Sequence, residues 1–314
     1  MRLRELQSAL EETLFVGQAF KLGVFNQLYR EPGTADERAK SMKFDRRATW
    51  VMLEALVEMG YITKKGEEYS VPDEIVSRLV EEGGDEYEGD FWKFLLYLVN
   101  PWRTLSHVLT HGEPDPSSYS ELDMKDFIRG MDSPWKKKIA PEVVKVCLEY
   151  SPNATTVADI GGAPGTLARE FSRKNIHTII YDLPESLEVM EKELSRIENV
   201  SLQKGDATVS LPEGPYDIAF LGNICHGQSP GDNQKIITMC HQNLDDNGII
   251  AIFDNLRGES YLGATLALHM LTQSKRGNIY TRDEYIQWLD TAGFRDVEVR
   301  SLSDPAWQVI IAFK

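Results

Sequence analysis

A histidine stands where an apolar segment of the sequence gives way to a loop. Residues 217–224 form an apolar run, His226 follows it, and residues 227–231 read G-Q-S-P-G, a composition that disfavours a helix. The run predicts a buried strand, which puts His226 just past the strand's carboxyl end. An imidazole is largely unprotonated at neutral pH and can take a proton from a hydroxyl group. His226 is thus a candidate general base, the alternative being a histidine that only caps the loop.

Residues 157–166 read V-A-D-I-G-G-A-P-G-T, a strand that runs into a glycine-rich turn. Gly161, Gly162 and Gly165 would let the backbone approach a ligand closely, as in nucleotide-binding turns between a strand and a helix. Asp159 lies within the strand and is predicted to face the charged end of that ligand. The segment therefore predicts a nucleotide-binding turn.

Two further aspartates end neighbouring strands. Asp182 closes I-I-Y-D, where a carboxylate can accept hydrogen bonds from ribose hydroxyls, and Asp206 in K-G-D-A-T is positioned for an adenine amino group. A dinucleotide is the rival ligand, but the turn reads G-G-x-x-G rather than G-x-G-x-x-G. Three carboxylates also suit a sulfonium and an ammonium better than a pyrophosphate. The pattern favours S-adenosylmethionine over NAD.

The elements that must position these residues alternate between strand and helix from about residue 153. This alternation predicts an α/β fold with a mostly parallel sheet covered by helices on both faces. Two last strands share a connection too short for a parallel crossover, so they are expected to be antiparallel. Strands are predicted at 155–160, 177–181, 200–204, 217–224, 248–254, 297–302 and 308–313, and helices at 166–173, 186–197, 232–244 and 281–292.

The first part of the chain is predicted to be mainly helical. Residues 15–29 have helical apolar spacing, Thr34 with Glu37 resembles a capped helix start, and Asp45 is placed to cap another helix. A short hairpin at 61–71 completes the element order of a winged helix. We expect a winged-helix dimerisation domain at 1–100, a helical connector that contributes to an acceptor pocket at 101–150, and a cofactor-binding catalytic domain at 151–314.

Charge and composition exclude several classes of function. The 314 residues carry a net charge of −15, which disfavours binding to a nucleic-acid backbone and favours protein contact over DNA reading for the winged helix. The three cysteines lack C-x-x-C spacing, so no metal site is expected. No apolar stretch approaches the roughly 18 residues that span a membrane, and we expect a cytoplasmic protein.

The segment 157–314 resembles the class I S-adenosylmethionine-dependent methyltransferases. It is most similar to the small-molecule O-methyltransferases typified by plant caffeate and flavonoid enzymes and by bacterial polyketide and hydroxyneurosporene enzymes. The resemblance is carried by V-A-D-I-G-G-A-P-G (157–165), Y-D-L-P (181–184), K-G-D-A (204–207), I-C-H (224–226), L-D-D-N-G (244–248) and T-A-G-F (291–294). It implies a Rossmann-like catalytic domain, a homodimer, and a partner subunit that helps to close the active site.

The resemblance also implies roles for individual residues. His226 matches the family's general base, and Asp254 matches a carboxylate that orients it. A second family carboxylate falls at Ile279, and the Asp-Trp that follows the histidine is Gly227-Gln228 here. A family lysine falls near Gly222 or Asn223. His226 is therefore expected to have one supporting carboxylate. Cofactor contacts are expected at Asp159, Gly161, Gly162, Gly165, Asp182, Leu183, Asp206, Ala207 and Asn223.

Large side chains before and after the sheet are the candidates for the acceptor pocket, with core packing as the alternative for each. They are Trp102, Phe127, Met131, Trp135, His269 and Met270. The predicted reaction is methyl transfer from S-adenosylmethionine to a hydroxyl of a small aromatic or polycyclic molecule. C- or N-methylation, or a reaction without methyl transfer on the same scaffold, stays open because of Ile279. A cofactor-sensing DNA-binding regulator is a further alternative.

Overall fold

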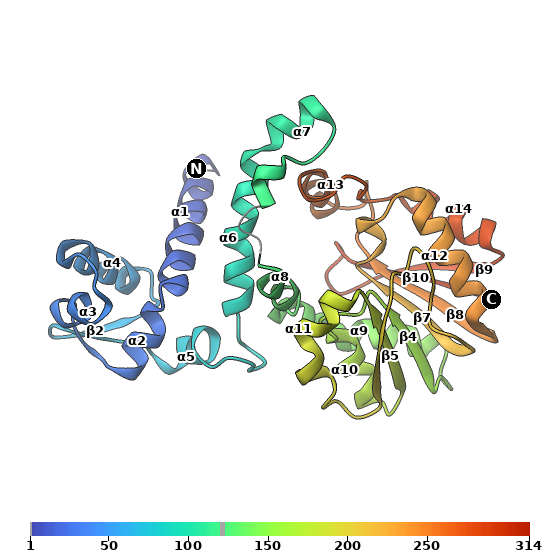
Figure 1. Cartoon of the computed structure of the whole chain (residues 1–314), viewed down its shortest axis with the longest axis horizontal. Helices are drawn as coiled ribbons and strands as arrows, with labels where there is room; N and C mark the ends of the chain where they lie inside the picture. The colour runs from blue at the N-terminus through green and yellow to red at the C-terminus, as the bar shows by residue number, and fades with distance from the viewer. Residues whose placement is uncertain (1, 120–122) are drawn as a thin grey trace. The chain divides into compact units, whose positions relative to one another are not determined.

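The computed structural model describes residues 2–119 and 123–314, which divide into two compact units, residues 1–99 and 100–314 (Figure 1). The first unit contains α1 (Arg2–Lys21), α2 (Val24–Arg30), α3 (Ala35–Met42), α4 (Arg46–Glu58) and α5 (Asp73–Leu79). Its small antiparallel sheet has the order β1-β3-β2, from β1 (Gly33–Thr34), β2 (Thr63–Lys65) and β3 (Glu68–Ser70). The predicted hairpin is confirmed by the pairing of β2 with β3.

Two of the predicted helix starts are confirmed by their caps. The Thr34 backbone N–H donates to the Glu37 carboxylate at 2.8 Å, and the Thr34 hydroxyl accepts from the Glu37 N–H, which is the reciprocal cap expected for α3. The Asp45 carboxylate accepts from the N–H of Ala48 at the start of α4. Residues 15–29 are two helices rather than one, because Gly23 between α1 and α2 adopts a left-handed φ of 76° that interrupts the helical path.

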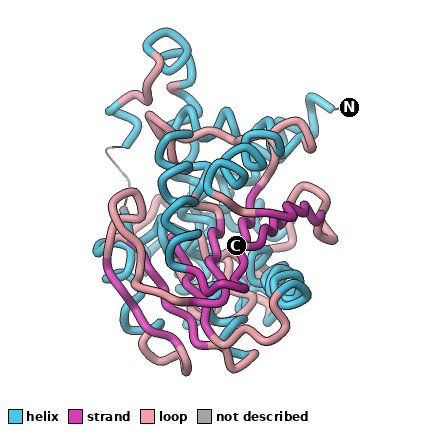
Figure 2. The backbone as a smooth tube through the Cα atoms, turned by 90° about the vertical axis from the view of Figure 1, so that its right-hand side faces the viewer, coloured by secondary structure: helices cyan, strands magenta, loops and turns pink. Residues whose placement is uncertain are grey.

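The second unit is built on a seven-stranded sheet of order β6-β5-β4-β7-β8-β10-β9. β10 is antiparallel to both of its neighbours and the remaining pairs are parallel, as predicted. Figure 2 traces these strands in magenta. They are β4 (Thr156–Ile160), β5 (His177–Asp182), β6 (Val200–Lys204), β7 (Tyr216–Gly222), β8 (Leu244–Asp254), β9 (Arg295–Ser301) and β10 (Gln308–Phe313).

Helices cover the sheet on both faces, as the alternation predicted (Figure 1). Along β4 the side chains alternate: Val157 joins the apolar core under α9 (Pro134–Tyr150) and α10 (Thr166–Arg173). Ala158 and Ile160 join the core under α12 (Pro230–Asn243) and α14 (Arg282–Ala292). A smaller cluster packs α11 (Pro184–Leu194) and α8 (Met124–Gly130) against β5 and β6.

Three further helices complete the described chain. They are α6 (Gly89–Arg103), α7 (Leu105–His111) and α13 (Tyr261–Gln273). The sequence analysis did not predict α13, which follows β8 and carries His269 and Met270. β7 ends at Gly222, so His226 lies beyond the strand in a short 3₁₀ turn, Cys225–Gly227. None of the described helices is long and apolar enough to cross a membrane.

Candidate active site

The glycine turn and the histidine loop leave the sheet side by side. β4 and β7 are hydrogen-bonded parallel neighbours although β5 and β6 separate them in sequence, so the chain reverses its direction of sheet growth between them. Ligands of open α/β sheets bind in the crevice outside the carboxyl ends of such strands. Gly161 has a φ of 70°, and a Cβ there would lie 2.7 Å from Ile224 Cδ1. The turn and the loop therefore pack so closely that position 161 has to be glycine.

The Asp182 carboxylate lies next to the glycine turn and binds its backbone. Its Oδ2 accepts a hydrogen bond from the Ala163 N–H at 2.9 Å and its Oδ1 accepts from the Leu183 N–H at 2.7 Å. Burial raises the pKa of this carboxyl group, and the two backbone donors oppose that rise. The Gly161 N–H is also bound, at 2.7 Å from the Tyr181 carbonyl oxygen. The end of β5 thus fixes the shape of the turn after β4.

The remaining predicted cofactor residues lie at the ends of β5 and β6 and after the turn. Asp206 accepts hydrogen bonds from the Thr208 N–H at 2.8 Å and from the Thr208 hydroxyl at 2.7 Å. Ala207 packs against the edge of the α12–α14 core. Leu183 is exposed at the start of α11, and Gly165 is the N-cap of α10.

Two of the predicted cofactor residues, Asp159 and Asn223, each have a buried polar atom with no partner among the described residues. Asp159 is 2% exposed, and its Oδ2 accepts no hydrogen bond. Asn223 has a φ of 60° and donates its backbone N–H to the Phe253 carbonyl, while its side-chain Nδ2 donates to nothing. Burying such atoms unpaired costs free energy, so they are typical of a ligand site. A lone acceptor and a lone donor fit the ammonium group and the heterocycle of S-adenosylmethionine.

His226 is bound to a buried carboxylate at the end of β8. Its Nδ1 lies 2.8 Å from Asp254 Oδ1, with 17% of the His226 side chain and 1% of that of Asp254 exposed. Asp254 Oδ1 also accepts the Asn255 N–H at 2.9 Å, and its Oδ2 accepts the Tyr285 hydroxyl at 3.2 Å. Burial, then the negative charge of Asp254, raises the pKa of Tyr285 well above its ordinary value, so this hydroxyl stays a donor.

Tyr285 is the residue that the sequence analysis missed. Its helix was predicted, and its position four residues after the Thr281 cap puts it on the buried face of α14. Nothing in the spacing to Asp254 reveals the contact, because α13 and its flanking loops separate the two residues in sequence. Ile279, at the position of the second family carboxylate, is fully buried. A neutral hydroxyl group, rather than a second carboxylate, therefore completes the surroundings of Asp254.

The loop that carries His226 is also held through its backbone. The His226 carbonyl oxygen accepts from the Asn278 N–H at 2.9 Å, and the Gln228 carbonyl oxygen accepts from the Tyr280 hydroxyl at 2.5 Å. On the other side the Cys225 carbonyl oxygen accepts from Asn233 Nδ2 at 2.9 Å. Contacts from two directions thus fix the loop that follows β7.

Cys225 is a core residue and not a nucleophile. It is 1% exposed in the α12–α14 core. Burial, together with the negative charge of Asp254, raises the pKa of its thiol well above the ordinary value. The thiolate form that a nucleophile requires is therefore disfavoured.

Only some of the predicted acceptor-pocket residues lie together. The rings of Trp102 and His269 stack with their centroids 6.3 Å apart. Burial and, to a smaller extent, the charge on His226 lower the pKa of His269 to about 4, which places the two histidines within electrostatic reach. Met270, on the same helix as His269, is 9% exposed.

The other three predicted pocket residues pack elsewhere in the second unit. Trp135 stacks on Trp307, with the ring centroids 4.8 Å apart, on the α9 side of the sheet. Phe127 packs with the cluster formed by α8, α11 and β5. Met131 is the half-buried C-cap residue of α8. The structure therefore does not gather all six predicted residues into one cluster.

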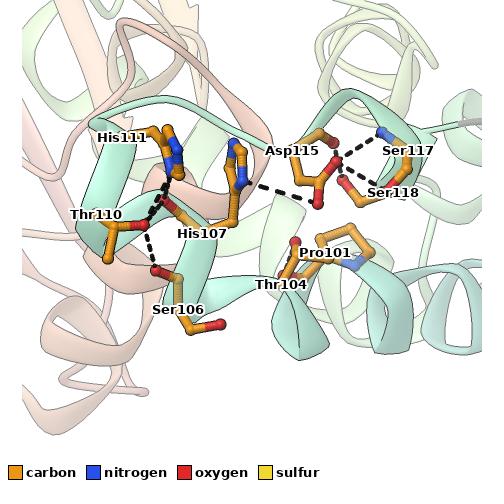
Figure 3. A network of polar contacts seen from close by, with 9 residues as sticks. All are labelled: Pro101, Thr104, Ser106, His107, Thr110, His111, Asp115, Ser117 and Ser118. Carbon is orange, nitrogen blue, oxygen red and sulfur yellow. Dashed lines mark hydrogen bonds and ion pairs between the residues drawn. The ribbon is translucent and has the colours of Figure 1, made fainter.

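Two other histidines lie on the short helix α7. Figure 3 shows His107 and His111 on α7, whose rings stack with their centroids 4.1 Å apart. His107 Nδ1 lies 4.0 Å from the Asp115 carboxylate, which also accepts from the Ser117 N–H. The residues that the structure describes contain no group of three or more His, Cys, Asp or Glu able to hold a metal ion.

Comparison with known proteins identifies the family. The O-methyltransferase domain matches residues 106–295, more than half of the chain. The chain belongs to the O-methyltransferase domain family. It is accordingly an enzyme, an S-adenosylmethionine-dependent methyltransferase, as the motifs of the glycine turn and the histidine loop predicted.

Individual relatives of this methyltransferase cover most of its length. It is 26% identical over 306 residues to the tetracenomycin polyketide synthesis 8-O-methyl transferase TcmO of Streptomyces glaucescens. The aligned residues cover 91% of this chain and 89% of that protein. It is 30% identical over 190 residues to acetylserotonin O-methyltransferase of Gallus gallus, covering 58% and 53%. An O-methyltransferase family protein from Burkholderia thailandensis has the same fold, with a TM-score of 0.84 at 19% identity over 100% and 97% of the two chains.

Proposed function

We propose that this methyltransferase methylates a hydroxyl group of a small aromatic or polycyclic molecule, with His226 as the general base. The observation that carries the proposal is the 2.8 Å contact between His226 Nδ1 and Asp254 Oδ1. A carboxylate accepts only, so Nδ1 carries the proton and Nε2 keeps a lone pair. That lone pair can receive the proton of an acceptor hydroxyl.

The surroundings of His226 support each stage of this proton transfer. Asp254 holds the ring in one tautomer and one orientation before the reaction and balances the positive charge of the imidazolium after it. The Asn255 and Tyr285 donors fix Asp254 in turn. S-Adenosylmethionine, when bound, supplies an electrophilic methyl group on a sulfonium leaving group. The chain's own contribution is therefore alignment and a stronger nucleophile.

The acceptor side offers aromatic and neutral polar surface. Trp102 provides a ring face, and His269, whose pKa is lowered to about 4, is a neutral donor or acceptor for a polar group at neutral pH. The names of relatives support an aromatic acceptor: one is a 3-hydroxy-5-methyl-1-naphthoate 3-O-methyltransferase of Streptomyces sahachiroi, 22% identical over 99% of this chain. The Asp254-bound base favours oxygen over nitrogen as the methylated atom, because a hydroxyl becomes a strong nucleophile only as it loses its proton, whereas a neutral amine attacks through its own lone pair.

We propose that the first unit, residues 1–99, is a winged helix that serves dimerisation. Its element order of helices followed by a hairpin supports this, and a homodimer and a cytoplasmic location remain predictions. The DNA-binding alternative finds little support at α4, because the Arg46 guanidinium at its start is bound by the Asp36 carboxylate, with Nη2 at 2.6 Å from Oδ2. Asp45 lies beside it.

Methyl-labelled S-adenosylmethionine tests the proposed function. The enzyme is incubated with a panel of hydroxylated naphthalenes, polyketide-like phenols and hydroxyindoles, each paired with its O-methyl ether as the matched control. We expect label on the oxygen of at least one free phenol and none on its ether, measured by mass spectrometry. Label on carbon or nitrogen, or on the ether, would contradict the O-methylation proposal.

A further inference from the structure

Lys136 is a buried cation that no structural role explains. It lies in the first turn of α9, a helix of 17 residues, and is 9% exposed. Positive charge is unfavourable at a helix N-terminus, and burial of an ammonium group costs free energy unless it is paired. Burial accordingly lowers the pKa of Lys136, against the opposing negative charges of Asp159, Asp132 and Asp254. The ion pairs found around the start of α9 in the described chain involve Arg129, Lys137 and Arg169, and not Lys136.

The neighbouring cations differ from Lys136 because they are already paired. Arg169 Nη1 lies 3.3 Å from Asp132 Oδ1, and Lys137 Nζ lies 3.7 Å from Asp132 Oδ2. Asp132 also accepts the Thr166 hydroxyl at 2.6 Å. Asp132 therefore already has three partners, and Lys136 differs from the exposed Lys138 in being a buried lysine without an ion pair.

Asp159 connects Lys136 with the cofactor turn. The positive charge of Lys136 is the influence that lowers the Asp159 pKa against the rise caused by burial. A Cβ on Gly162 would lie 2.7 Å from Asp159 Cγ, so the Asp159 carboxyl group lies directly against the glycine turn. Asp159 Oδ2 has no partner either. An unpaired acid and an unpaired base thus lie near one another at the turn without forming an ion pair within 4.0 Å.

The cofactor carries the complementary pair of charges on its methionyl group, an ammonium and a carboxylate. Asp159, Asp182 and Asp206 can receive cations and hydroxyl groups, but none of them can receive a carboxylate. We propose that Lys136 binds the cofactor's carboxylate while Asp159 binds its ammonium group. The inference rests on S-adenosylmethionine as the cofactor and is independent of which atom of the acceptor is methylated.

Isothermal titration calorimetry with two cofactors tests this assignment. S-Adenosylmethionine is compared with S-adenosylmethioninamine, which keeps the sulfonium and ammonium groups but lacks the carboxylate. The wild-type enzyme is expected to bind S-adenosylmethionine roughly 10- to 100-fold more tightly, since hydrogen bonds to a charged group have that effect on a dissociation constant. A preference below about threefold would overturn the proposal without the need for any variant.

Lys136→Met, which keeps the length of the side chain and removes the charge, is expected to lose that preference. Its affinity for S-adenosylmethionine falls and its affinity for the decarboxylated cofactor does not. Lys138→Met removes an exposed charge from the same turn and should behave as the wild type towards both ligands. Equal losses for the two ligands in Lys136→Met would assign Lys136 a structural role and contradict the proposal. Because only binding is measured, this result is distinct from a failure of O-methylation.

Discussion

Asp159 and Asp254 are buried aspartates at the carboxyl edge of one sheet, yet the protein surrounds them differently. Asp254 is 1% exposed, and both of its oxygens are bound by His226, Asn255 and Tyr285. Asp159 is 2% exposed, its Oδ2 has no partner, and burial raises its pKa to about 7. The first acid is completed by the protein itself, whereas the second is left for a ligand to complete.

The difference separates two tasks within one crevice. A carboxylate that orients a base has to be rigid before the acceptor arrives, so its bonds come from the folded chain. A carboxylate that binds a cationic cofactor must keep its acceptor capacity free, at a cost in the stability of the protein without the cofactor. The fold thus holds Asp254 and His226 in place before any ligand binds, whereas Asp159 keeps a free acceptor.

The largest effect is expected for His226→Ala. Without the base, turnover should fall about 10²- to 10⁴-fold, while the affinity for S-adenosylmethionine stays close to that of the wild type. Turnover numbers and calorimetric binding check the two halves of this prediction. If the variant turned over at the wild-type rate, His226 would not be the general base. His241→Ala, near the carboxyl end of α12, is the matched control and should retain activity.

Asp254→Asn tests the orientation of the base by its partner. The amide is isosteric, but it no longer balances the imidazolium charge, so kcat should fall roughly 10- to 100-fold. KM for the cofactor should change little. A fall in cofactor affinity as large as that in kcat would show that the two sides of the crevice are not separate.

Asp159→Asn is expected to weaken cofactor binding about 10-fold with no direct effect on the proton transfer. Binding of the wild type should strengthen as the pH rises through about 7, because the ammonium group requires the ionised carboxylate. The variant should lack this pH dependence. Calorimetry between pH 6 and 8 measures both, and a pH-independent wild type would refute the role of Asp159.

The ionisation of Asp159 should also change the free energy of unfolding of the cofactor-free protein. The pKa of Asp159 is raised above its unfolded value, so its contribution to stability is complete below about pH 4 and is lost as the pH rises through about 7. Asp159→Asn should therefore be more stable than the wild type above pH 7, by up to about 4 kcal/mol. Thermal melting at pH 5 and pH 8, compared between the two proteins, is the measurement.

The smallest effect is expected for Tyr285→Phe. The ring keeps its edge-to-face contacts with Tyr280 and Trp288, and only the hydroxyl that binds Asp254 is lost. We expect about a threefold loss of kcat and an altered pH profile of kcat/KM, since the variant changes the charge environment of the base. An unchanged profile with a lowered melting temperature would assign Tyr285 to packing alone.

The surroundings of Asp159 and those of Asp254 also differ in how well the sequence predicts them. The glycine turn, Asp182 and Asp206 lie next to strands with strong apolar patterns, and strand ends are local features that a sequence displays. The strands and the antiparallel end of the sheet were predicted for the same reason. The places of these residues at strand ends were therefore predictable, whereas their contacts with the cofactor stay a prediction.

The acceptor side was less predictable, because it is assembled from distant segments. The contact of Tyr285 with Asp254 and the stacking of His269 on Trp102 depend on how α13 and α14 return to the sheet. α13 itself escaped prediction because it is apolar on most faces and lacks a clear helical periodicity. Lys136 stands beside two other lysines, and its sequence neighbours do not reveal that it alone is buried.

The backbone contact between Asn278 and the carbonyl oxygen of His226 determines which substitutions the histidine loop tolerates. Neither partner uses its side chain, and a Cβ on Gly277 would lie 2.5 Å from that same carbonyl oxygen. Any side chain at 277 would push against the backbone of His226, whereas a substitution at 278 would leave this backbone contact in place.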